Sequence, residues 1–201
     1  MAGQNLEIEV KFLVDDLVAV RRRLLALGAG LHKARVHERN IRFDNPWDGL
    51  RMQGKLLRLR QDTTARLTYK GEPQTSVDSE ARVREELETE VGDFQTTLQL
   101  LQRVGFEPKQ VYEKYRETFH FGQVEVVLDE LPFGDFVELE GDDDAIQAAA
   151  AALGLDWQRR ILANYLAIMA GLQERFGLGF DDVTFENFAG VDVSAADLLT
   201  E

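Results

Sequence analysis

The sequence predicts an α+β protein in which an eight-stranded antiparallel β-barrel encloses a charged lumen and helices pack outside. About eight segments alternate charged and aliphatic residues at strict period two, so each strand has one charged and one aliphatic face. Four further segments have helical spacing and can cover the aliphatic faces. An ordinary small barrel is filled with apolar side chains. The inverted pattern therefore predicts a tunnel lined by charges.

Composition restricts the function classes. The 201 residues, 44% hydrophobic and 29% charged, are enough for one domain with a sizeable core and a small appendage. The chain has no cysteine, no run of 18 apolar residues and no N-terminal segment of signal-peptide type, so we expect a soluble, cytoplasmic protein. The net charge of −13 opposes attraction to nucleic acid or an anionic membrane. An anionic ligand would need a local convergence of basic residues.

The first strand is predicted over residues 7–11, which run Glu-Ile-Glu-Val-Lys. Glu7, Glu9 and Lys11 share one face, and the two carboxylates lie about 7 Å apart along the strand. Such a face suits a hard divalent cation together with one end of an anion. When this segment is taken alone, a simple solvated face explains it better than a site does. The recurrence of the pattern downstream favours a site.

The next elements follow from spacing and turn residues. A helix is predicted over residues 17–27, because aliphatic residues recur at helical spacing before Gly28. Strands are predicted over 37–43, 56–61 and 65–70. The last two strands are separated only by Asp-Thr-Thr and should therefore form a hairpin.

The middle of the chain contains the clearest strands. A long charged strand over 83–91 precedes a helix that Asp93 caps and that ends before Gly105. Strands over 111–121, 124–131 and 136–140 then follow one another with tight turns between them.

The C-terminal part is predicted to be helical. One helix covers residues 142–153, where three aspartates suit the positive end of the helix, and another covers 158–176. Residues 177–201 are acidic and weakly patterned, and form either an ordered extension or a mobile tail. We therefore expect a tunnel domain over 1–176 and an acidic extension over 177–201.

The charged strand faces supply the residues expected to line the lumen. Seven are basic and seven are acidic, and equal numbers allow many charges to be enclosed without a large net field. They are Glu7, Glu9, Lys11, Arg58, Arg60, Lys70, Arg84, Glu86, Glu88, Lys114, Arg116, Asp129, Glu138 and Glu140.

Seven motifs in order carry a resemblance to a known family. They are Glu-Ile-Glu-Val-Lys at 7–11, Leu-Arg-Leu-Arg at 57–60, Thr-Tyr-Lys-Gly at 68–71, Arg-Glu-Glu-Leu-Glu at 84–88, Glu-Lys-Tyr-Arg at 113–116, Leu-Asp at 128–129 and Phe-Val-Glu-Leu-Glu at 136–140. Over roughly residues 5–175 the chain resembles the CYTH family, also called triphosphate tunnel metalloenzymes. The opening motif is moderately specific, whereas the ordered set is strong evidence.

The resemblance implies an eight-stranded antiparallel tunnel that binds a triphosphate with the help of Mg²⁺ or Mn²⁺. The positions that match the family's metal-holding acids are Glu7, Glu9, Asp129, Glu138 and Glu140. The positions that match its catalytic and phosphate-gripping bases are Lys11, Arg58, Arg60, Lys70, Arg84 and Arg116, with Lys114 beside them. Glu86 and Glu88 match further acidic lining positions of the catalytic set. The chain departs from the family around Arg39 and Arg42, where a tyrosine commonly precedes Phe-Asp, so no substrate role is assigned there.

Three functions are compatible with these residues. The first is a metal-dependent triphosphatase acting on inorganic triphosphate, thiamine triphosphate or a nucleotide such as ATP. The second is a class IV adenylyl cyclase, which must also hold adenine and activate the ribose hydroxyl. The third is a non-catalytic polyphosphate-binding tunnel, which would not favour so many carboxylates. We favour hydrolysis because it needs the fewest specific contacts. A homodimer is compatible with the sequence, although no stripe of residues indicates one.

Overall fold

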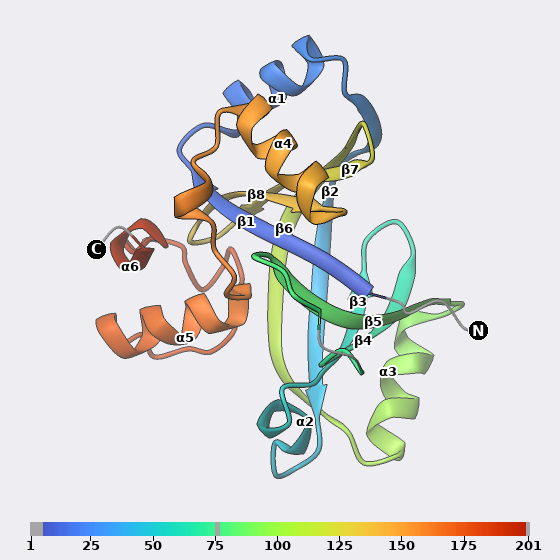
Figure 1. Ribbon diagram of the computed structural model, residues 1–201. Helices are drawn as coiled ribbons and strands as arrows, with labels where there is room; N and C mark the ends of the chain where they lie inside the picture. Colours follow the sequence, from blue (N-terminus) through green and yellow to red (C-terminus); the bar gives the residue numbers. More distant parts are fainter. Residues whose placement is uncertain (1–5, 75–76, 200–201) are drawn as a thin grey trace, which may run out of the picture.

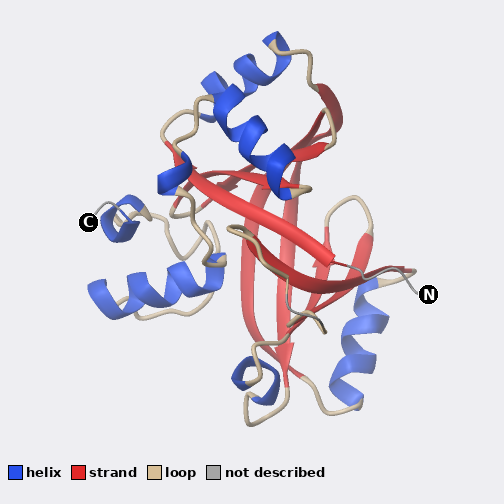
Figure 2. Cartoon of the chain, in the orientation of Figure 1, coloured by secondary structure: helices blue, strands red, loops and turns tan. Residues whose placement is uncertain are grey.

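The eight strands form one closed antiparallel barrel, as the sequence predicts. A computed structural model describes residues 6–74 and 77–199. In the barrel the strands follow the order β1-β5-β4-β3-β2-β6-β7-β8, and the helices lie outside it (Figures 1 and 2). The strands are β1 (Leu6–Val14), β2 (Gly30–Asp44), β3 (Leu56–Gln61), β4 (Ala65–Gly71), β5 (Arg82–Val91), β6 (Glu107–Phe121), β7 (Val124–Leu131) and β8 (Gly134–Glu140).

The helices cover the aliphatic faces of the strands. They are α1 (Leu17–Ala26), α2 (Gly49–Met52), α3 (Phe94–Arg103), α4 (Asp143–Leu153), α5 (Tyr165–Phe176) and α6 (Ala196–Leu199), with a 3-10 turn at Trp157–Arg159. Figure 1 shows α1 and α4 together at the top of the barrel, α3 at its lower right, and α5 with α6 on its left side. Within the described ranges, no helix has both the length and the hydrophobicity needed to span a bilayer.

The charged faces of the strands point inward, which confirms the predicted parity. Val10, Val126 and Leu139 are fully buried in one hydrophobic cluster together with residues of α1 and α4. Leu59 is buried against Phe94 of α3 in another cluster. Apolar packing therefore takes place between barrel and helices rather than inside the barrel.

β1 closes the barrel by pairing with β8 on one side and with β5 on the other, over stretches of different length. It pairs with β8 from Glu9 to Val14 but with β5 only from Leu6 to Glu9. Beyond Glu9, the backbone of Lys11 instead exchanges two hydrogen bonds with Ile161, at 3.2 and 2.7 Å. The chain that leads into α5 thus covers the edge of β1 that β5 leaves unpaired.

Several predicted elements differ in their bounds. The strand predicted over 7–11 spans Leu6–Val14, and the strand predicted over 111–121 begins at Glu107. Two elements differ by more. The strand expected over 37–43 extends over Gly30–Asp44, because it pairs with β6 along a long ribbon whose bulges near Lys33 interrupt the period-two pattern. The helix expected over 158–176 begins only at Tyr165. Ile161 leaves helical geometry to pair with Lys11, and the Asn164 side chain then caps α5 by accepting a hydrogen bond from Ala167 N at 2.8 Å.

Residues 177–199 pack against the barrel and α5. Val183, Phe188 and Ala195 are buried in a hydrophobic cluster with residues of α5 and β8. The backbone of Val183 also hydrogen-bonds to Val111 and Glu113 of β6, each at 2.8 Å. This part of the tail is therefore an ordered extension.

We expect Phe188→Ala to lower the free energy of unfolding by about 3 kcal/mol, because it removes a buried ring and leaves a cavity. Chemical denaturation of both proteins measures this difference. The control is Phe176→Ala, which removes a ring that is 41% exposed and should cost much less. Equal losses in the two variants would contradict a structural role for the tail.

Candidate active site

The barrel encloses a cavity of about 370 Å³. Fifteen of its twenty lining residues are charged, eight of them basic and seven acidic. The charged lining residues are Glu7, Glu9, Lys11, Arg58, Arg60, Lys70, Arg82, Arg84, Glu86, Glu88, Lys114, Arg116, Glu125, Glu138 and Glu140. The others are Leu56, Tyr112, Asn164, Tyr165 and Leu166. The cavity is therefore suited to a small, highly charged ligand rather than an apolar one.

Thirteen of the fourteen residues predicted to line the lumen do so. The exception is Asp129, which has no exposed surface and lies behind the cavity wall. Its carboxylate accepts hydrogen bonds from Lys114 Nζ at 2.8 Å, Arg116 Nε at 2.7 Å and the Tyr165 hydroxyl at 3.0 Å. In this arrangement Asp129 anchors two of the lining cations.

Acidic residues gather where β1, β7 and β8 meet. The strand register places Glu9 opposite Glu140, and Glu140 opposite Glu125. Burial, together with neighbouring Glu7 and Glu125, raises the pKa of Glu140 to about 8. Burial also raises the pKa of Glu7 to about 7, although Lys70 opposes the shift. Glu7 and Glu140 therefore lie close to other carboxylates, and the positive charge near them is too small to keep their pKa values at the ordinary value.

We call the carboxylates gathered here, with Glu140 at their centre, the acidic mouth. Their oxygen donors fit a divalent cation that prefers oxygen ligands. Within the described ranges, no three acidic or histidine residues already lie close enough together to hold a metal ion. The Glu140 side chain forms no hydrogen bond or ion pair with any described residue, so its oxygens are available. Mg²⁺ needs few protein carboxylates, because it retains waters and binds phosphate oxygens at the same time.

All the basic lining residues except Arg84 are paired with a carboxylate. Lys11 Nζ lies 2.8 Å from Glu9, Arg60 donates to Glu88 at 3.0 Å, and Arg116 donates to Glu138 at 2.6 Å. Lys70 donates two short hydrogen bonds to Glu7. These pairs fix the cations in position and neutralise much of the charge before any ligand arrives.

Tyr165 reaches this network from α5. Its hydroxyl donates to Asp129, and its ring lies 5.5 Å from Lys11 Nζ and 5.2 Å from Lys114 Nζ. Burial, with Asp129 and Glu138 nearby, raises the pKa of Tyr165 well above its usual value. The hydroxyl therefore remains a hydrogen-bond donor, and its ring adds cation–π contacts to two lining lysines.

Arg84 belongs to the cavity lining, whereas Arg39 and Arg42 of β2 do not. Arg84 lines the cavity, but its guanidinium donates to the carbonyl oxygens of Gly71 at 2.9 Å and Gly54 at 2.6 Å. It thereby joins the two chain segments that contain Gly54 and Gly71. Arg39 is exposed, and Arg42 pairs with Asp44 at 3.4 Å outside the cavity lining, in agreement with the absence of any substrate role assigned to them.

Sequence reasoning missed several residues of the site. Glu125 and Arg82 line the cavity and share parity with Asp129 and Arg84, so the period-two pattern itself contained the signal. Tyr165 occupies an apolar helical stripe, which predicts only a core position. Glu38 lies behind the wall on β2, where the irregular pattern concealed the strand face.

Comparisons with known proteins agree with this geometry. The CYTH domain family matches residues 5–161. The protein MJ0240 of Methanocaldococcus jannaschii, provisionally named an adenylate cyclase, is 30% identical over 137 residues, which cover 67% of this chain and 76% of that protein.

Two solved structures show the same fold. One, from Vibrio parahaemolyticus and also provisionally named an adenylate cyclase, has a TM-score of 0.73 at 23% identity and covers 83% of this chain and 98% of that chain. The other, HpAC1 from Hippeastrum, is described as a provisional adenylyl cyclase with a dominant triphosphatase activity. Its TM-score is 0.56 at 20% identity, and the match covers 81% of this chain and 94% of that chain.

Proposed function

The chain belongs to the CYTH domain family, and from this premise we propose that it is a metal-dependent triphosphatase acting on inorganic or organic triphosphate. The observation that carries the proposal is the cavity itself, in which eight basic residues share the lining with seven carboxylates. A triphosphate carries several adjacent negative charges and binds divalent cations. Such a cavity matches both halves of that ligand.

The basic residues are proposed to bind the phosphate oxygens. Arg58 and Arg60 can each offer two parallel donors, whereas Lys11 and Lys70 act as compact point charges. Arg116 and Lys114 extend this surface on β6. Phosphoryl transfer depends mainly on positioning and on neutralising developing charge, so the site needs no side-chain nucleophile.

The carboxylates at the mouth are proposed to hold Mg²⁺ or Mn²⁺. Glu7, Glu9, Glu138 and Glu140 have the oxygen donors that these ions require. Asp129 was expected in this set, but it has no exposed surface and lies outside the cavity lining, so we assign it to anchoring Lys114 and Arg116. A bound ion would supply positive charge to the phosphoryl oxygens. Glu86 and Glu88 are proposed to orient basic neighbours, because they pair with Lys70 and Arg60.

An adenylyl cyclase is the second candidate, favoured by the name of the 30% identical relative. A selective cyclase needs side chains that recognise the hydrogen-bonding edge of adenine. Among the uncharged lining residues, the Tyr165 hydroxyl already donates to Asp129, and the Asn164 amide oxygen caps α5. The Tyr112 hydroxyl accepts a hydrogen bond from Arg58 at 3.3 Å, and the remaining two residues are Leu56 and Leu166. This lining favours a ligand recognised by its phosphates.

We therefore expect the purified protein with Mg²⁺ or Mn²⁺ to release orthophosphate from inorganic triphosphate faster than it forms cyclic AMP from ATP. Phosphate, pyrophosphate and cyclic AMP should be measured side by side on inorganic triphosphate, thiamine triphosphate and ATP. Efficient formation of cyclic AMP and pyrophosphate, with negligible triphosphate hydrolysis, would replace the triphosphatase with the cyclase. Tight triphosphate binding without turnover would indicate a binding protein.

A further inference from the structure

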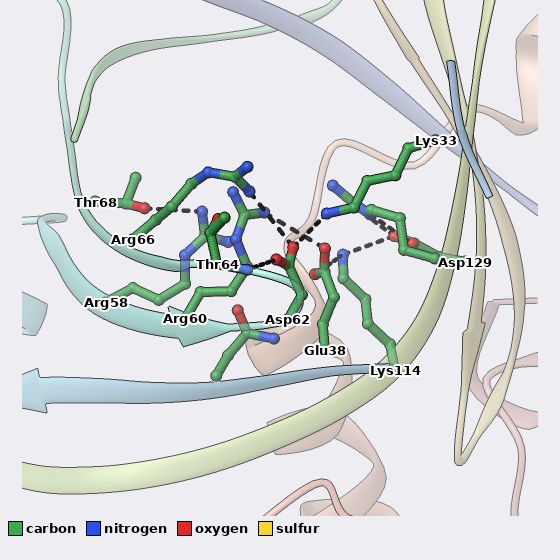
Figure 3. Close-up of polar contacts among 12 residues, drawn as sticks. Lys33, Glu38, Arg58, Arg60, Asp62, Thr64, Arg66, Thr68, Lys114 and Asp129 are labelled. Carbon is green, nitrogen blue, oxygen red and sulfur yellow. Dashed lines mark hydrogen bonds and ion pairs between the residues drawn. The ribbon is translucent and has the colours of Figure 1, made fainter. Parts of the chain in front are cut away.

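Glu38 is a buried carboxylate directly behind four basic lining residues, which we call the basic wall. They are Arg58, Arg60, Lys114 and Arg116. It is 1% exposed and does not line the cavity. Its two oxygens lie 3.6 Å from Arg60 Nη1 and 3.9 Å from Lys114 Nζ, and Figure 3 shows its carboxylate between those two side chains. Both of these cations line the cavity. Glu38 therefore acts on a ligand only through charge or through its neighbours.

Other carboxylates fix the positions of these two cations. Arg60 donates to both oxygens of Glu88 at 3.0 Å, and Lys114 donates to Asp129 at 2.8 Å. Glu38 lies farther from both, and its Oε2 atom has no hydrogen-bond partner among the described residues. The hydrogen-bonded pairs should therefore set the geometry of Arg60 and Lys114. What Glu38 adds is a negative charge.

The Glu38 carboxylate keeps this negative charge in the folded protein. Burial by itself would raise the pKa of Glu38, but Arg116, Lys114, Arg60 and Arg58 outweigh burial and lower the pKa to about 2. All four of these cations line the cavity. Glu38 consequently remains ionised at neutral pH and offsets part of the positive field that a phosphate group meets there.

We propose that Glu38 is a built-in counter-charge that limits how tightly the basic wall holds phosphate groups, so that the ligand and its phosphate products can leave. The inference rests on the proposed function, because it requires that the cavity bind triphosphate. It predicts a sign that a positioning role would not. Removing the charge strengthens phosphate binding, whereas loss of positioning would weaken it.

The size of the effect follows from Coulomb's law. A unit charge about 8 Å from a phosphate, at an effective dielectric constant of about 20, changes affinity by roughly thirtyfold. Solvent in the open cavity reduces this effect. We therefore expect Glu38→Gln, which keeps the shape of the side chain, to tighten binding by roughly tenfold.

The test is calorimetric titration of inorganic triphosphate in EDTA, where no metal-dependent turnover occurs, on the wild type and Glu38→Gln. The matched control is Asp62→Asn. The Asp62 side chain is also fully buried and its pKa is lowered to about 2, but its ion-pair partners Lys33 and Arg66 lie outside the cavity lining. Arg60 is the one lining cation among the groups that lower this pKa, and it has the smallest effect of them. We expect the control to change the triphosphate Kd by less than about threefold, because both ion-pair partners of Asp62 lie outside the cavity lining.

The outcomes separate the hypotheses. Tighter triphosphate binding by Glu38→Gln alone, together with a lower KM and stronger inhibition by pyrophosphate in Mg²⁺, supports the counter-charge. Unchanged or weaker binding by Glu38→Gln, or equal tightening by Asp62→Asn, overturns it. A wild type that neither binds triphosphate in EDTA nor hydrolyses it with Mg²⁺ or Mn²⁺ overturns the proposed function itself, and the counter-charge with it. If the wild type binds triphosphate only with metal, an unchanged or higher KM and unchanged pyrophosphate inhibition in Glu38→Gln overturn the counter-charge alone.

A second pair of variants covers the case in which Glu38→Gln does not fold. Lys114→Gln is compared with the double variant Lys114→Gln plus Glu38→Gln, which removes one charge of each sign from this contact. The added Glu38→Gln change should tighten triphosphate binding by roughly tenfold over Lys114→Gln. Equal or weaker binding by the double variant also overturns the proposal.

Discussion

Replacing Arg58 with alanine is expected to lower kcat/KM for triphosphate by roughly 100- to 1,000-fold, because a preorganised charged donor is lost. Arg58 lies in the cavity lining and donates to Thr68 at 3.1 Å and Glu88 at 3.4 Å, so its guanidinium is held in place before the ligand binds. Steady-state rates across a series of Mg²⁺ and Mn²⁺ concentrations measure the effect. Extra metal should not restore the activity.

The corresponding change among the proposed metal ligands is Glu9→Gln, which keeps the shape of the side chain but removes its negative charge. Activity should fall roughly tenfold to hundredfold and recover in part as the metal concentration rises. Glu9 also pairs with Lys11 at 2.8 Å, so thermal denaturation of the variant controls for folding. If both variants responded to metal in the same way, the division between phosphate-binding and metal-binding residues would be wrong.

The metal-free protein is expected to lose thermal stability as the pH rises from about 5.5 to about 8.5, by on the order of 5 °C in Tm. Glu7 and Glu140 have pKa values of about 7 and about 8 in the folded protein, above the ordinary value of 4.5. The folded state therefore binds more protons than the unfolded state in this window. The stability that these two groups contribute is fully present below their ordinary pKa and is lost as they ionise.

A divalent cation should reverse this loss by neutralising the same carboxylates. The increase in Tm on adding Mg²⁺ or Mn²⁺ should be larger at about pH 8.5 than at about pH 5.5, because protons compete with the metal at low pH. Scanning calorimetry in EDTA and in each metal measures both effects. Glu140→Gln should flatten the pH dependence. A metal-free Tm that rises over this range would contradict the crowding of carboxylates at the mouth.

The barrel and most of its lining were predictable, because one physical rule governs both. In a strand, parity alone decides which face a side chain occupies, so the alternation around Glu7, Arg58 and Glu138 indicates a shared lumen once the sheet closes. The helices that cover the outside were predictable from apolar spacing and caps such as Asp93, which accepts from Thr96 N at 2.6 Å.

The remaining features depend on contacts between segments distant in sequence. Ile161 leaves helical geometry only because the edge of β1 is free beyond Glu9, which no local pattern records. Asp129 shares the parity of the lining, but Lys114, Arg116 and Tyr165 draw its carboxylate behind the wall. Glu38 was hidden because its neighbours of opposite parity, His37 and Arg39, are polar and exposed, so the charged–aliphatic alternation is lost there.

The pairing of β1 with β8 also determines when the site can exist during folding. Glu9 lies opposite Glu140, and Lys11 opposite Glu138, across the seam where the first strand meets the last. A contact between such distant positions forms late, since the chain entropy of a long loop is lost before the contact stabilises it. During synthesis, hairpins such as β3–β4 can form long before β8 leaves the ribosome. The acidic mouth is therefore assembled in the closing step, and its appearance reports that the barrel is complete.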